Sequence, residues 1–152
     1  MQKDFTQFVS KDSVLVLSGN TKLEVMDQLI NRAAELTKLD RDVIFRLTWK
    51  REQMITTGVG GKLAMPHIRI NDIQNPYVIV GICENPISDY QGQDGQPVSV
   101  IVFIVAPDAN QEEYLQLLSS ISRRFRNSDV IEKLIDADGI DNIYDIIKNG
   151  EN

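Results

Sequence analysis

Hydrophobic residues recur at intervals of three and four along much of the chain, the spacing that places side chains on one face of a helix. Leu23, Met26, Ile30 and Ala33 form such a stripe in a predicted helix at 21–37, which begins with the capping-box spacing of Thr21-Lys-Leu-Glu24. Further stripes predict helices at 40–53, from Asn110 to Phe125, at 128–137 and at 141–149 ending at Gly150, with Asp40, Asn110 and Ser128 as N-caps.

Three segments have the β-branched, apolar composition of strands: residues 14–17, 77–83 and 98–105. The third is almost entirely apolar, as expected of a central strand covered on both faces. Between the last two, residues 85–97 contain Asp-Gly, Gln-Gly and Gln-Pro pairs and predict a turn, and residues 55–70 predict a glycine-rich bend followed by a short strand. We therefore expect an α/β fold, a mixed sheet sandwiched between helices.

The composition indicates a cytoplasmic protein. With 152 residues the chain has the length of one domain, which we place at 1–152. Its one cysteine, Cys83, excludes an internal disulfide and favours a reducing compartment. The longest apolar run, 98–106, is far too short for membrane insertion, and the N-terminus lacks the apolar stretch of a signal peptide.

The charge is unevenly distributed along the chain, and one segment is strongly basic. The net charge of −6 argues against a nucleic-acid partner, but residues 46–70 hold five Lys or Arg residues and one acid, Glu52. This segment is either an ordinary solvated surface or the site of an anionic ligand. It also contains His67, the only histidine of the chain.

The glycines before His67 do not form a known nucleotide-binding loop. A P-loop would need glycine at Thr56 and a hydroxyl residue at Leu63, and a dinucleotide fingerprint starting at Gly58 would also need glycine at Leu63. A metal site would need ligands besides the one histidine, in a segment of positive charge, so we expect no metal and no cofactor.

One histidine is enough for phosphoryl relay, because a neutral imidazole is a good nucleophile toward phosphorus near neutral pH. Glycines at 58, 60 and 61 would let backbone N–H groups approach the phosphoryl oxygens, and Arg51 would clamp them. The alternative is that His67 is an ordinary half-buried histidine.

The surrounding motifs resemble the active-site region of enzyme IIA domains, type 2, of the bacterial phosphoenolpyruvate-dependent phosphotransferase system (PTS). The motifs are Arg51-Glu52, Thr57-Gly58-Val59-Gly60, Ala64-Met65-Pro66-His67, Gln93-Asp-Gly-Gln-Pro-Val98 and Val105-Ala-Pro107. The family includes fructose–mannitol and nitrogen-regulatory members, and the resemblance covers nearly the whole chain.

The resemblance implies an enzyme IIA phosphocarrier, a phosphotransferase component. His67 would accept a phosphoryl group from the carrier protein HPr, and Arg51 would assist. The acceptor would be a IIB domain or a regulatory target protein. Thr57, Gly58, Gly60 and Gly61 would support the phosphoryl site. The alternative is a degenerate member that acts only as a regulatory binding module.

Three residues depart from the family pattern. Tyr114 stands where many members have a second histidine, and a phenol cannot replace an imidazole as an acid or base near pH 7. It either lies beside His67 or only begins the apolar stripe that runs through Leu117 and Ile121. Lys62 stands where glycine is common, and Ile68 where a small residue is usual.

Overall fold

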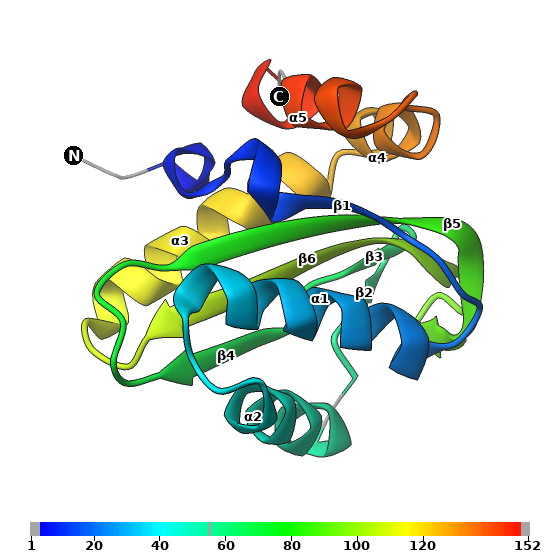
Figure 1. The fold of residues 1–152 in the computed structure, drawn as a ribbon. Coiled ribbons are helices and arrows are strands. Elements are labelled where there is room, and N and C mark those ends of the chain that lie inside the picture. Colours follow the sequence, from blue (N-terminus) through cyan, green and yellow to red (C-terminus); the bar gives the residue numbers. More distant parts are fainter. Residues whose placement is uncertain (1–3, 55, 150–152) are drawn as a thin grey trace.

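The structure is a computed structural model that describes residues 4–54 and 56–149. The ends of the predicted domain, 1–152, and the predicted helix end at Gly150 lie outside these ranges. Within them the chain forms a mixed sheet with helices on both faces, which confirms the expected fold class (Figure 1).

The helices begin and end close to where the apolar stripes placed them. They are α1 (Lys22–Thr37), α2 (Arg41–Met54), α3 (Gln111–Phe125), α4 (Ser128–Ile135) and α5 (Ile140–Asn149). Thr21 and Glu24 form the predicted capping box, and Asn110 accepts a hydrogen bond from the Glu113 N–H. The predicted cap of α4 is wrong: Asn127 caps this helix and Ser128 is its first residue, because the Asn127 side chain accepts from two backbone N–H groups.

Two 3-10 turns, η1 (Phe5–Phe8) and η2 (Lys11–Ser13), were not predicted from the sequence.

In the part of the chain that the structure describes, the sheet has six strands: β1 (Val14–Leu17), β2 (Gly58–Gly60), β3 (Leu63–Ala64), β4 (His67–Ile70), β5 (Tyr77–Gln91) and β6 (Pro97–Pro107). Strand β6 is central, antiparallel to β5 and parallel to both β3 and β4, which follow one another along its other side. Strand β1 is parallel to β5, and β2 is antiparallel to β3.

Two predicted loops are largely strand. Strand β5 continues through Asn85 and Pro86 to Gln91, because Ile87 and Tyr90 are buried and Ile87 pairs with Val98 of β6. The pairing shifts register between Ile82 and Ile87, where proline has no N–H to donate. The glycine-rich segment likewise forms the β2–β3 hairpin before β4, rather than a bend and one strand.

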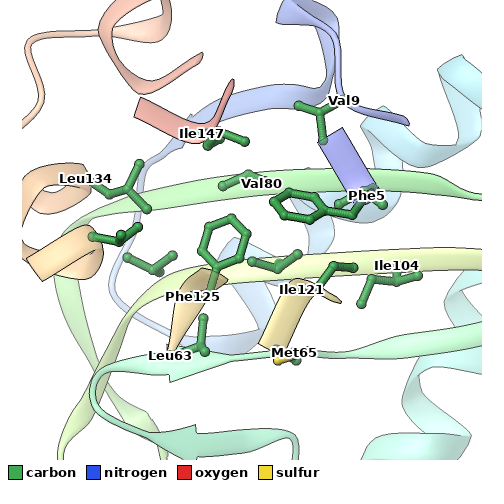
Figure 2. Close-up of a cluster of buried hydrophobic side chains, with 14 of the residues drawn as sticks. Phe5, Val9, Leu63, Met65, Val80, Ile104, Ile121, Phe125, Leu134 and Ile147 are labelled. Carbon is green, nitrogen blue, oxygen red and sulfur yellow. The ribbon is translucent and has the colours of Figure 1, made fainter. Parts of the chain in front are cut away.

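Alternate residues of the central strand supply two separate cores. Phe103 and Val105 face α1 and α2, whereas Val102 and Ile104 face η1 and helices α3 to α5. Figure 2 shows the second core, in which the side chain of Met65 lies among the apolar residues that these helices contribute. Within the residues described, the longest apolar helices are too short or too polar to cross a lipid bilayer.

Candidate active site

Strand β4 lies at the edge of the sheet, with α2 and α3 on opposite faces (Figure 1). A hollow of about 300 Å³ is lined by residues of these three elements. Its lining brings together His67, Arg51 and Tyr114, which the sequence had singled out from three different elements. The other lining residues are Leu47, Lys50, Met54, Ile68 and Arg69.

His67 is the first residue of β4, and the neighbouring central strand fixes its backbone. It pairs with Ile104, whose N–H donates to the Pro66 carbonyl at 3.0 Å. Its ring Nδ1 lies 2.7 Å from the Met65 carbonyl oxygen. A carbonyl can only accept a hydrogen bond, so Nδ1 carries the proton and Nε2 keeps its lone pair.

Burial lowers the pKa of His67 below its ordinary value, because the charged imidazolium loses solvation. The hydrogen bond to Met65 opposes this effect, the positive charge of Arg51 lowers the pKa further, and the negative charge of Glu52 raises it. The imidazole is therefore neutral, and nucleophilic, at neutral pH.

Three cationic side chains line the hollow with His67. Arg51 lies in the last turn of α2, near the end of the helix predicted at 40–53, with Lys50 beside it. Arg69 follows two residues after His67 on β4 and therefore lies on the same face of the strand. Sequence reasoning counted Arg69 and Lys50 only as part of a basic segment. The alternation of a strand through His67 was the signal that would have found Arg69.

Tyr114 lies near both His67 and Arg69 of β4. Its ring centroid lies 6.2 Å from that of His67 at an interplanar angle of 58°, and the Arg69 guanidinium lies 4.5 Å from the same ring. Arg69 also donates to Gln111 at 2.5 Å and to the Ala109 carbonyl at 3.3 Å, which ties β4 to the start of α3. Tyr114 packs against the apolar core as well, so it belongs to both the hollow and the stripe. Burial raises the pKa of its phenol, which is neutral at pH 7.

The glycines lie farther along the sheet. Leu63 pairs with Val100 and His67 with Ile104, a separation of four residues on β6 or about 13 Å. A Cβ on Gly58 would stand 2.5 Å from the Gln91 carbonyl oxygen, and the Gly61 N–H donates to Asp94 at 2.9 Å. The close approach that Gly58 permits is to Gln91 at the end of β5, and none of Gly58, Gly60 and Gly61 lines the hollow. Their part in a phosphoryl site stays a prediction.

Thr57 is buried behind the hollow rather than in its lining. Its hydroxyl donates to the Glu52 carboxylate at 2.5 Å, and its carbonyl accepts from the Met65 N–H at 3.0 Å. Lys62 adopts a left-handed backbone, φ 69°, where glycine would be unstrained, and pairs with Glu132 at 3.0 Å. Ile68 points into the core on the α1–α2 side.

No group of three or more His, Cys, Asp or Glu side chains suited to a metal ion occurs in residues 4–54 and 56–149.

The sequence matches the family model for the phosphoenolpyruvate-dependent sugar phosphotransferase system, EIIA 2, over residues 7–150. A nitrogen regulatory protein from Pseudomonas aeruginosa is 32% identical over 141 residues, which cover 92% of this chain and 91% of that protein. A PTS fructose-specific EIIA component from Haloferax volcanii is 30% identical over 128 residues, which cover 84% of this chain and 82% of that protein.

Solved structures share the fold. The nitrogen regulatory protein IIA-Ntr from Neisseria meningitidis superposes with a TM-score of 0.86 at 19% identity, covering 94% of this chain and 98% of that one. A chain in the complex of mannitol enzyme IIA with phosphorylated enzyme IIB from Escherichia coli superposes with a TM-score of 0.74 at 14% identity, covering 93% of this chain and 97% of that one.

Proposed function

The chain belongs to the EIIA 2 family of the phosphoenolpyruvate-dependent sugar phosphotransferase system, and we propose that it is a phosphocarrier that takes a phosphoryl group on His67. The observation that carries the proposal is the contact between His67 Nδ1 and the Met65 carbonyl at 2.7 Å. It leaves Nε2 of a neutral ring as the nucleophile, at a hollow lined by Arg51.

The transfer exchanges one P–N bond for another. The Nε2 lone pair of His67 attacks the phosphorus of a donor phosphohistidine, and the donor nitrogen leaves with the electron pair of its own P–N bond. We propose HPr or an HPr-like carrier as the donor. Arg51, with Lys50 and Arg69 in the same lining, would stabilise the charge on the three transferring oxygens.

The phosphoryl group then goes either to a IIB domain or to a regulatory use. EIIA domains of this family pair with IIB domains, and the mannitol complex is a solved example. One observation favours regulation: a relative of similar length is named nitrogen regulatory protein. The resemblance of the motifs also implies that Tyr114 stands where many members have a second histidine. We therefore propose a regulatory phosphocarrier that works in the cytoplasm with its relay partners.

Intact-mass measurement tests the proposal directly. Incubation with phosphoenolpyruvate, enzyme I and HPr should add one phosphoryl group that is labile to acid and stable to base. His67→Ala should add none. A phosphoryl group that persists on His67→Ala would remove His67 from the role, and an unmodified wild-type protein that still binds a IIB domain or regulator would favour the non-catalytic binding module.

A further inference from the structure

Behind the hollow, a buried ion pair links α1 to α2. Lys22 Nζ lies 2.6 Å from Glu52 Oε1, and the side chains are only 17% and 2% exposed. The Lys22 ammonium also lies 4.4 Å from the ring centroid of Tyr90 and 5.6 Å from that of Trp49. A buried ion pair costs desolvation, and an apolar pair of similar volume is often at least as stable. The pair therefore calls for a reason besides stability.

The second oxygen of Glu52 holds Thr57. Because a carboxylate only accepts, the Thr57 hydroxyl donates to Glu52 Oε2 at 2.5 Å. The Thr57 hydroxyl has then used its one proton, so the hydrogen bond between Thr57 and Tyr90 has the Tyr90 phenol as donor. Tyr90 therefore donates to Thr57 but does not connect Glu52 to His67, whereas Glu52 accepts the hydrogen bond that holds Thr57 in place.

The chain of hydrogen bonds continues from Thr57 to the imidazole. The Thr57 carbonyl accepts from the Met65 N–H at 3.0 Å, and the Met65 carbonyl accepts from His67 Nδ1 at 2.7 Å. The Met65 side chain is anchored in the core, so its peptide group has little freedom to turn (Figure 2). Four consecutive contacts therefore join Lys22 to the ring of His67.

We propose that Glu52, held by Lys22, is a positioning residue that fixes the orientation and tautomer of His67 through Thr57 and Met65. Loss of the Glu52–Thr57 bond frees the start of the β2–β3 hairpin, and the Met65 carbonyl no longer aligns with Nδ1. The imidazole then samples both tautomers, and Nε2 is a free nucleophile for only part of the time. The consequence for phosphoryl transfer rests on the proposed function, whereas the tautomer itself does not.

The sole histidine of the chain makes a sharp experiment possible. Protein labelled with ¹⁵N-histidine gives the signals of one imidazole, and these report the tautomer at pH 8 without any phosphorylation. In wild type, Nδ1 should carry the proton. Thr57→Val, which replaces the hydroxyl by a methyl group, should shift His67 toward a mixture of tautomers and slow phosphorylation roughly tenfold. Glu52→Leu, which removes both acceptor oxygens, should change the tautomer in the same direction.

Thr57→Ser and Tyr90→Phe are the matched controls. Thr57→Ser keeps the hydroxyl and should restore both the tautomer and the rate. Tyr90→Phe removes a buried hydroxyl from the same cluster but leaves the Glu52–Thr57 bond, so it should lower stability without changing the tautomer. A wild-type tautomer in folded Thr57→Val, or an equal change in Tyr90→Phe, would overturn the proposal. If wild type is not phosphorylated but the tautomers behave as expected, the proposed function fails and the positioning role stands.

Discussion

The ring of Tyr114 contacts both His67 and Arg69: its centroid lies 6.2 Å from the His67 centroid and 4.5 Å from the Arg69 guanidinium. The resemblance of the sequence motifs implies that this position corresponds to a second histidine in many family members. A phenol there can donate a hydrogen bond to a phosphoryl oxygen, but its raised pKa prevents it from acting as a base at neutral pH.

Tyr114→Phe separates the hydroxyl from the packing. The ring still fills its place against the core and under Arg69, so the melting temperature should change little. If the hydroxyl contacts the transferring group, the rate of phosphorylation by HPr should fall by roughly tenfold, the loss of one donor hydrogen bond. Rapid-quench kinetics measures the rate. An unchanged rate would leave Tyr114 with a packing role only.

Arg51→Ala should impair transfer more than folding. Arg51 is half-buried in the last turn of α2 and lines the hollow, where its positive charge lowers the pKa of His67. Removing a preorganised cationic donor should slow phosphorylation by about one hundredfold. Arg51→Lys keeps the charge but lacks the planar guanidinium, so its phosphorylation rate should lie between those of wild type and Arg51→Ala. The matched control is Arg46→Ala, which removes an exposed cation of the same helix that does not line the hollow. Equal losses in Arg46→Ala and Arg51→Ala would indicate a general charge effect instead.

Local patterns were sufficient for the elements that carry the site. Helix spacing placed Arg51 near the end of α2, and the short motif around His67 identified the nucleophile candidate. The course of β5 beyond Cys83 was not predictable in this way, because Asn85-Pro86 reads locally as a turn. Burial of Ile87 and Tyr90 against the rest of the sheet overrides that local preference.

The support behind the site depends on contacts between residues far apart in the sequence. Lys22 meets Glu52 thirty positions later, and Tyr90 reaches Thr57 from the far half of β5. No spacing rule connects such residues, since their proximity results from the packing of α1 and α2 on the sheet. The glycines show the converse: their proximity to His67 in sequence does not place them in the lining of the hollow.

Lys62→Gly should be more stable than Lys62→Ala. Both variants lose the ion pair with Glu132. The side chains of Lys62 and Glu132 are 39% and 56% exposed, so this ion pair contributes less than about 1 kcal/mol to stability. Only glycine adopts the left-handed backbone, φ 69°, without steric cost, so the free energy of unfolding should differ by about 1 kcal/mol in its favour. Urea denaturation measures the difference. Equal stabilities would mean that the backbone at Lys62 is not strained.

Titration of the ¹⁵N-labelled His67 ring should give a pKa below the ordinary value of 6.5, because burial disfavours the imidazolium. His67 then remains a neutral acceptor as the pH falls through 6.5. The lowered pKa also affects the free energy of unfolding, because the unfolded chain binds the proton more readily than the folded chain. The contribution of neutral His67 to stability is therefore complete above pH 6.5 and is lost as the pH falls toward the folded-state pKa. His67→Gln has no such titration and is the control. The stability advantage of wild type over His67→Gln should therefore decrease below pH 6.5 in urea denaturation. A measured pKa above 6.5, or an advantage that grows with acidity, would contradict a nucleophile kept neutral by burial.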